Sequence, residues 1–405
     1  MGCQVTGDRW AKWTVSIPSQ GCELLGAYRI AVALKDCIVM IHGPTGCHYG
    51  PNFLEVLSNN LLSSGTVSAM RDRSVIYGGI ENLEKAIAVT RKYYKNKKII
   101  VLSSYVPSII GDDLEFVDAD ICLDCGGFGP MWQGMEMFLD KLGDFIRSEN
   151  DNDKDKKENL INLIGFQEDV AGGKEDLEEI KRVLSLYNIN TNVIPDSFES
   201  LKYAKHASLN VVFGYGIKLA KRMEREVGIP YIVVDYPYGV EGIKRFIDAI
   251  YQHSEFNFDI NYKVFDGIYE RLKKYRDNLP LFYEVPACVV GDLPRISGLS
   301  RFLEEELGMN VELAFATSSA REKFGVSCSK FVSESFDEFA EEIKGKERDI
   351  KVLFGTDDER RVRSDTIVLA FPSFTRMSFV PYMGKGTLNL ISDIYERIVR
   401  NAWIK

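Results

Sequence analysis

Two cysteines stand in glycine-rich loops, where thiols can bind metal. Cys47 ends the run HGPTGC (residues 42–47), which directly follows the apolar, β-branched stretch 37–41. That stretch predicts a buried strand, and the Gly and Pro residues predict a sharp turn at its carboxyl end, where open α/β sheets bind their ligands. Cys22 ends a similar run, PSQGC, and glycines such as Gly46 let a cofactor approach the backbone closely. The pattern favours a metal or iron–sulfur site over a packed core.

A second pair of cysteines, Cys122 and Cys125, has C-x-x-C spacing and is followed by Gly126 and Gly127. This spacing fits a redox-active pair, one half of a metal site, or two strand residues on opposite faces. Three more cysteines fall in or beside apolar strand patterns and are expected to be core residues: Cys37, Cys288 and Cys328.

The composition predicts a large globular protein of a reducing compartment. The chain has 405 residues, of which 45% are hydrophobic, and its formal net charge of -9 argues against nucleic acid or an anionic membrane as the main partner. The first residues show no charged-then-apolar signal pattern, and no apolar run approaches the roughly 18 residues that span a bilayer. We therefore expect a cytoplasmic protein whose cysteines serve metal binding or catalysis rather than disulfides.

Short apolar runs alternate with amphipathic helical patterns from end to end, which predicts α/β architecture with parallel sheets and helical crossovers. The strand candidates are residues 38–41, 99–102, 160–165, 209–213, 231–234, 287–290, 351–354 and 366–370. Helical stripes at i, i+3 and i+7 spacing include Leu177, Ile180 and Leu184, and a similar stripe runs through residues 388–399.

Two breaks divide this pattern into segments of similar size. Residues 148–158 (SENDNDKDKKE) contain no apolar side chain, and residues 279–286 contain two prolines. We expect three Rossmann-like, doubly wound domains: residues 1–150 with the loop cysteines, 158–282 and 286–384. A C-terminal helix over residues 385–405 should pack back onto other domains, because its apolar stripe needs cover.

The sequence contains one imperfect dinucleotide motif and no ATP-binding loop. Gly214-Tyr215-Gly216 follows a strand candidate, but the third glycine position holds Leu219, where close strand–helix packing leaves no space for a side chain. No G-x-x-x-x-G-K-[ST] sequence occurs. The acidic run GDDLE (residues 111–115) is expected to cap the start of a helix rather than to bind metal. We therefore expect neither a nicotinamide cofactor nor ATP on this chain.

Several short motifs follow one another in a fixed order. They are Gly21-Cys22, HGPTGC ending at Cys47, YGG (77–79), SSYVPSIIGDD (103–113) and CGGF (125–128), with FPSFTR (371–376) near the end. This order resembles the nitrogenase component 1 family over nearly the whole chain. That family includes the molybdenum–iron protein subunits, a related cofactor scaffold, the dark protochlorophyllide reductase subunits and a reductase of coenzyme synthesis.

The resemblance implies three Rossmann-like domains around a central cleft. It implies a homodimer, or a heterodimer or tetramer with a homologous subunit, and an iron–sulfur cluster, expected to be [4Fe-4S], shared across the subunit interface. It also implies a separate ATP-hydrolysing iron protein that delivers electrons. Cys22 and Cys47 fall on the first two cysteine ligand positions. Thiolates on exposed turns suit such a shared iron site.

Some positions depart from the family pattern. Tyr105 stands at the usual third cysteine ligand, where it could bind iron as a phenolate or pack at a strand end. Cys125, with Cys122 as a substitute, or a second subunit could complete the ligand set. Gly214 stands where a nitrogenase α subunit carries its cofactor cysteine, and residues 377–383 contain no histidine as the other ligand. We expect that the chain neither holds the molybdenum–iron cofactor nor reduces dinitrogen.

Three functions are consistent with these features. The first is the catalytic subunit of a two-component reductase for a small organic substrate such as a tetrapyrrole. The second is a scaffold subunit for metal-cofactor assembly, and the third is a non-catalytic partner of a catalytic homologue. Candidate proton donors or substrate anchors are His42, His48, Tyr105 and Arg376, chosen for the near-neutral pKa of His and the fixed donors of Arg.

Overall fold

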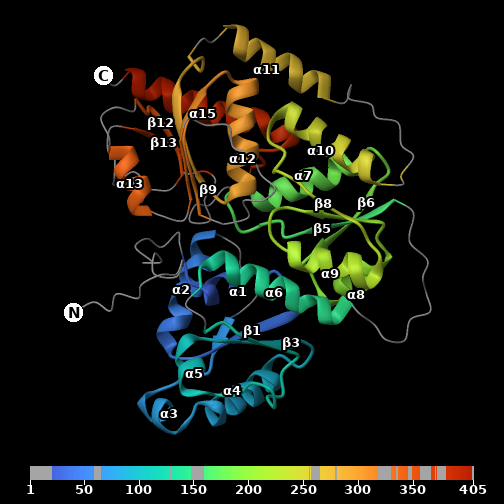
Figure 1. The fold of residues 1–405 in the computed structure, drawn as a ribbon, viewed down its shortest axis with the longest axis vertical. Helices are drawn as coiled ribbons and strands as arrows, with labels where there is room; N and C mark the ends of the chain where they lie inside the picture. Colours follow the sequence, from blue (N-terminus) through green and yellow to red (C-terminus); the bar gives the residue numbers. More distant parts are fainter. Residues whose placement is uncertain are drawn as a thin grey trace. The chain divides into compact units, whose positions relative to one another are not determined.

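Three parallel β-sheets form the framework of the protein (Figure 1). The computed structural model describes residues 21–58, 65–126, 129–146, 159–254, 256, 265–278, 281–317, 330–333, 336–344, 349–355, 366–369, 371 and 380–403. The predicted linker at 148–158, Cys328 and Arg376 lie outside these residues. Within them, no helix is both long and apolar enough to cross a bilayer.

Each sheet is built from one continuous region of the chain. The first has the order β2-β1-β3-β4, the second β6-β5-β7-β8 and the third β11-β10-β9-β12-β13. Their strands are β1 (Cys37–His42), β2 (Gly65–Val67), β3 (Lys98–Ser103), β4 (Ile121–Asp124), β5 (Leu160–Ile164), β6 (Asn190–Ile194), β7 (Leu209–Val212), β8 (Tyr231–Val233), β9 (Pro286–Gly291), β10 (Asn310–Ala316), β11 (Lys330–Ser333), β12 (Val352–Phe354) and β13 (Ile367–Leu369). All eight predicted strands are confirmed, and the α/β class with them.

Helices connect the strands throughout. They are α1 (Glu23–Ala31), α2 (Thr45–Ser58), α3 (Asp72–Tyr77), α4 (Ile80–Tyr93), α5 (Tyr105–Ile110), α6 (Met131–Ile146), α7 (Gly173–Ser185), α8 (Phe198–Tyr203), η3 (Ala204–His206), α9 (Ile217–Val227), α10 (Gly239–His253), α11 (Asp266–Asn278), α12 (Leu293–Arg301), η5 (Phe302–Glu306), α13 (Phe336–Lys344), η7 (Gly384–Gly386) and α15 (Thr387–Trp403). The predicted stripe of α7 is buried as expected. The C-terminal helix α15 packs against α11 and β13.

Contacts group the chain into two compact units. Unit 1 comprises Met1–Asp155, Val193–His206 and Tyr215–Gly228, and unit 2 comprises Lys156–Asn192, Ala207–Gly214 and Ile229–Lys405. Unit 1 therefore holds the first sheet and, in addition, helices α8 and α9, which pack against α6.

The first sheet is covered by helices on both faces. On one face, Leu83 and Ile87 of α4 pack against Met40, Ile99 and Val101 of the strands. Helices α1 and α6 lie together over the other face (Figure 1), and α1 contacts β3. Burial on both faces explains why β1 and β3 are apolar without alternation.

Helices α1 and α6 approach each other closely at two glycines. A Cβ at Gly26 would overlap the Met131 carbonyl oxygen, and a Cβ at Gly134 would overlap the Glu23 carbonyl oxygen. Only glycine permits this approach. The crossing fixes the start of α1, which is the position of Cys22.

Candidate metal centre at the edge of the first sheet

Three loops with candidate residues leave adjacent strands at the same edge of the first sheet. In the parallel register His42 pairs with Ser103, and Ser103 pairs with Asp124. The carboxyl ends of β1, β3 and β4 therefore coincide. The segments that follow them carry Cys47, Tyr105 and Cys125, which confirms that the HGPTGC run follows the end of a buried strand.

Cys22 reaches this edge through a different contact. It is the N-cap residue of α1, and it pairs in an isolated antiparallel bridge with Pro130, five residues after Cys125. The Glu23 N–H donates to the Gly129 carbonyl at 3.0 Å. The start of α1 is thus tied to the segment that follows β4.

The thiol of Cys22 interacts electrostatically with those of Cys47 and Cys125. Burial raises the pKa of Cys47, the nearby Ser104 hydroxyl lowers it, and the proximity of Cys22 raises it. Burial also raises the pKa of Cys125 well above its ordinary value, with further contributions from Glu23, Asp124 and Cys22. Cys22 is exposed, Cys47 is half-buried and Cys125 is buried, so the group runs from the surface inward.

No three His, Cys, Asp or Glu side chains in the described part of the chain are placed to hold a single metal ion. An iron–sulfur cluster is larger than an ion and separates its ligands more widely.

Tyr105 is the first residue of α5 and is half-exposed. Its neighbour Ser104 is fully buried and does not cap the helix with its side chain. Instead, the Ser104 side chain lies against Gly43, and a Cβ added at Gly43 would overlap the Ser104 hydroxyl. This contact brings the start of α5 against the turn that carries Cys47.

His42 belongs to a buried hydrogen-bond network rather than to the surface. Its Nδ1 lies 2.9 Å from Ser68 Oγ, and its Nε2 lies 3.1 Å from Asp112 Oδ2. The Gly43 N–H donates to Ser68 Oγ at 3.1 Å, and the Gly79 N–H donates to both Asp112 oxygens at 2.9 Å. Burial lowers the pKa of His42, opposed by Asp112. A neutral ring that accepts from Ser68 and donates to Asp112 satisfies every partner.

The acidic run at residues 111–115 does not start a helix, so that prediction is wrong. Helix α5 ends at Ile110, Gly111 takes a left-handed φ of 79°, and the next element is β4. Asp112 accepts hydrogen bonds from two other loops instead. The motif was visible in the sequence, but its partners are distant in the chain and carried no local signal.

The remaining candidates differ in their burial and surroundings. His48 is half-buried, burial lowers its pKa, and its ring lies against Gly65 of β2. Cys122 packs against the core under α4 and lines an acidic groove of about 530 Å³. A Cβ at Gly46 would meet nothing within 4 Å, so the turn before Cys47 is open on that side. Cys37 and Cys288 are core residues, as predicted.

The imperfect dinucleotide motif is occupied by a side chain of the protein itself. Glu136 of α6 accepts hydrogen bonds from the N–H groups of Gly216, Ile217 and Lys218 at the start of α9. A carboxylate thus takes the place that a phosphate takes at such helix starts. Leu219 is fully buried.

Gly214 is enclosed by the protein. It has a φ of 86°, and a Cβ there would overlap the Pro294 ring. Next to Pro294, the fully buried Arg295 lies with its guanidinium carbon 3.8 Å from the ring centre of Tyr236. Phe213 packs against that same ring at 5.2 Å. The surroundings of Gly214 are therefore filled by side chains.

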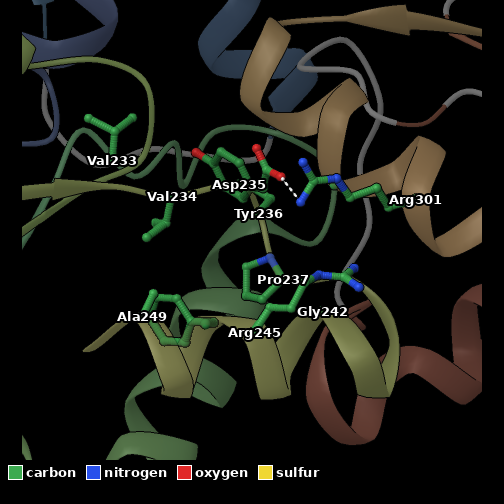
Figure 2. A pocket seen from close by; sticks show the side chains of 11 residues that line it. Val233, Val234, Asp235, Tyr236, Pro237, Gly242, Arg245, Ala249 and Arg301 are labelled. Carbon is green, nitrogen blue, oxygen red and sulfur yellow. Dashed lines mark ion pairs between the residues drawn. The ribbon is translucent and has the colours of Figure 1, made fainter. Parts of the chain in front are cut away.

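A cavity of about 220 Å³ lies at the end of β8 (Figure 2). Each arginine side chain that lines it forms an ion pair with a carboxylate. Asp235 Oδ2 lies 3.1 Å from Arg301 Nη1, the pair that is dashed in Figure 2. Arg245 pairs with Glu305 at 2.6 Å. Burial raises the pKa of Asp235, and Arg301 opposes this rise. Because each guanidinium here already has a carboxylate partner, we place the candidate site at the cysteines.

The parallel sheets with helical crossovers and a thiol-lined edge define an α/β protein of the Rossmann-like type with several sheets. A family model described as nitrogenase component 1 type oxidoreductase matches residues 22–399. The chain belongs to this family. A solved structure of nitrogenase Cp1 at pH 6.5 has the same fold, with a TM-score of 0.78 at 20% identity over 96% of this chain and 94% of that one.

Relatives in the family differ in their roles. The nitrogenase molybdenum–iron protein alpha chain of Methanothermobacter marburgensis is 25% identical, over 98% of this chain and 92% of its own length. A subunit of the light-independent protochlorophyllide reductase of Chaetosphaeridium globosum is 24% identical, over 95% and 82%. The cofactor biosynthesis protein NifE of Nostoc sp. is 26% identical, over 56% and 49%. Membership in the family therefore leaves the specific role open.

Proposed function

We propose that the chain is the substrate-side subunit of a nitrogenase-like two-component reductase. It accepts electrons from a separate ATP-hydrolysing iron protein through an iron–sulfur cluster at a subunit interface and passes them to a small organic acceptor. The observation that carries this proposal is that Cys47 and Cys125 follow strands that end at one sheet edge, and that Cys22, bridged to Pro130, interacts electrostatically with both.

The donor set fits such a cluster. Thiolates are the usual ligands of iron–sulfur centres, and Cys22, Cys47 and Cys125 would supply three of them. Tyr105, at the same edge, or a residue of a second subunit would supply the fourth. Cys22 is exposed at its helix start, which leaves room for a ligand from another chain.

When bound, the cluster supplies one-electron transfer at a potential set by its hydrogen bonds and its exposure. Reducing one double bond of an organic acceptor takes two electrons from the iron protein and two protons from water. The chain's own residues hold the ligands in place and exclude water, as the burial of Cys125 and Ser104 indicates.

Exposed apolar side chains on the site's own elements support an association surface. Tyr77 is 81% exposed, Ile109 65% and Phe116 86%. Ile109 lies on the same helix as Tyr105, and Tyr77 precedes the glycine turn that binds Asp112. Exposed large apolar residues next to a functional site are typical of protein interfaces.

The enclosure of Gly214 supports an acceptor other than dinitrogen. The Pro294 ring leaves no space for a side chain at this position, and therefore none for a cysteine that would hold a metal cofactor there. A scaffold role is the second candidate, favoured by the similarity to NifE. Such a scaffold would have to hold its cargo away from Gly214.

Anaerobic purification tests the proposal. We expect iron and sulfide in equal amounts, about four of each per cluster, together with a co-purifying homologous chain or a homodimer. Iron that leaves the chain for an acceptor protein, without reduction of any organic substrate, would support the scaffold. A chain free of iron that only binds a homologue would indicate the non-catalytic partner and contradict the proposal.

A further inference from the structure

The network around His42 joins three of the sequence motifs of unit 1 at one point. His42 begins HGPTGC, Gly79 ends YGG, and Asp112 belongs to the GDD run. Asp112 binds the other two, through His42 Nε2 at 3.1 Å and the Gly79 N–H at 2.9 Å. Its side chain is only 5% exposed, and that of His42 is fully buried.

The Nδ1 side of the His42 ring is linked through Ser68 to the turn that carries Cys47. Ser68 Oγ bridges His42 Nδ1 at 2.9 Å and the Gly43 N–H at 3.1 Å. The Gly43 carbonyl accepts from the Met70 N–H at 3.0 Å, so both polar groups of Gly43 are held by the segment after β2. The turn to Cys47 starts at this residue.

The glycine at position 79 is part of the same arrangement. A Cβ there would lie 2.6 Å from Asp112 Oδ2 and 2.9 Å from His42 Cε1, closer than real contacts. A side chain would therefore displace the carboxylate from the imidazole. Glycine at this position lets the backbone N–H approach the Asp112 carboxylate at hydrogen-bond distance.

We propose that His42, Asp112 and Ser68 are positioning residues that hold the Cys47 turn in its ligand geometry. The proposal deepens the proposed function, on which it rests for the role of Cys47 as a ligand. His42 does not contact a substrate in this role: its buried ring transmits the fixed position of Asp112 to Ser68, and Ser68 fixes Gly43. A fully satisfied buried network of this kind specifies one geometry.

The reactivity of Cys47 in the reduced, metal-free full-length chain measures this positioning directly. Native alkylation with iodoacetamide, followed by peptide mass spectrometry, gives separate rates for Cys47 and Cys22. A half-buried thiol reacts through local opening, so its rate follows the population of the open turn. Losing one or two of these hydrogen bonds should raise the ratio of the Cys47 rate to the Cys22 rate about fivefold.

The variants are Asp112→Asn and Ser68→Ala, each with a matched control in the same unit. Glu136→Gln alters another buried carboxylate that accepts backbone N–H groups, and Ser197→Ala removes another hydroxyl that accepts one, from Ser200 at 3.1 Å. The proposal expects the ratio to rise in the first two variants and to stay at the wild-type value in the controls. If Asp112→Asn fails to fold, the result of the milder variant Ser68→Ala decides the test.

If the ratio of the Cys47 rate to the Cys22 rate rises less than about threefold over wild type in the folded variants, the proposal is overturned. An equal rise in the controls would overturn it as well. The measurement uses metal-free protein, so its failure is separate from that of the proposed function. If the wild type binds iron but the ratio is unchanged in the two variants, only the positioning role is refuted. If the wild type binds no iron but the ratio rises in the two variants, the positioning role stands and the proposed function is refuted.

Discussion

Gly214 carries two constraints that can be separated by substitution. Its φ is 86° and the Pro294 ring blocks a Cβ, whereas Gly228 has a φ of 75° and open space around it. We expect Gly214→Ala to cost about 3 kcal/mol of unfolding free energy and Gly228→Ala about 1 kcal/mol, because only the first adds overpacking to the left-handed backbone. Denaturant midpoints of the two variants give the comparison.

Removal of the ring supplies the control for this prediction. Pro294→Ala in the Gly214→Ala background should recover the overpacking part of the loss. Equal costs at positions 214 and 228 would mean that the enclosure of Gly214 is loose, and the argument against a cofactor at that position would fall.

Among the cysteines, the structure separates ligand candidates from the rest. Cys47→Ser should abolish the iron–sulfur absorption and leave the far-ultraviolet circular dichroism unchanged. Cys122→Ser should keep the absorption, because Cys122 packs against the core under α4. Absorption retained in Cys47→Ser, or lost only in Cys122→Ser, would contradict the assignment.

Glycines and strand ends mark Cys22, Cys47 and Cys125 locally, so the sequence singles them out as ligand candidates. It could not identify Ser68 or the role of Asp112, since each acts through residues that are far away in the chain. For the same reason Glu136, which fills the start of α9 from 80 residues away, had no sequence signal. Long-range partners of polar groups are the information that local patterns lack.

At the scale of elements, the crossing of α1 and α6 positions Cys22. Gly134→Ala should destabilise the protein by about 3 kcal/mol and reduce iron binding, since its Cβ would overlap the Glu23 carbonyl. Gly143→Ala on the same helix is the control, because it meets only the flexible Arg222 side chain, which can move. Thermal unfolding and iron content measure both effects. Similar behaviour of the two variants would show that the crossing does not hold Cys22.

Helix α7 is joined to the segment before α15 by a fully buried carboxylate. Asp176 Oδ1 accepts from the Tyr382 N–H at 2.6 Å and the Met383 N–H at 2.8 Å, and burial raises its pKa to about 7. The folded state thus binds a proton more tightly than the unfolded state. Stability from this group is present at low pH and is lost as the pH rises from about 4 to about 7.

Asp176→Asn should remove this dependence while keeping an acceptor for both N–H groups. Relative to wild type, the variant should gain about 2 kcal/mol of stability between pH 5 and pH 8. Glu306, whose pKa burial also raises to about 7, contributes equally to both proteins and cancels in the comparison. Urea unfolding at the two pH values checks the sign; a difference that stays constant or falls would show that Asp176 is charged in the folded state.

Element prediction succeeded where burial made the strands uniformly apolar. Strands β1, β5 and β7 are buried at every residue, and their sequences are nearly continuous apolar runs. Five strands of the described part were not predicted: β2, β4, β6, β10 and β11. Among them, β2 has three half-buried residues, GTV, and β6 begins with the polar run NTN. These edge strands owe their conformation to pairing with a neighbour, which a local pattern does not contain.

For the whole molecule, the alternation of strands and helices predicted the class, and the order of motifs predicted the family. The predicted domain boundaries and the interface cluster stay predictions. The role of the chain depends on partners that neither periodicity nor spacing can name. It must therefore be decided by electron transfer rather than by structure.

The most direct measurement follows electrons onto this chain. The anaerobically purified protein is mixed with an iron protein of the nitrogenase type from the same source, ATP and dithionite, and electron paramagnetic resonance is recorded by freeze-quench. We expect an ATP-dependent signal of the reduced cluster in the wild type, and we expect this signal to be absent in Cys47→Ser. ATP hydrolysis by the iron protein without any change in the spectrum of this chain would contradict the electron-accepting role.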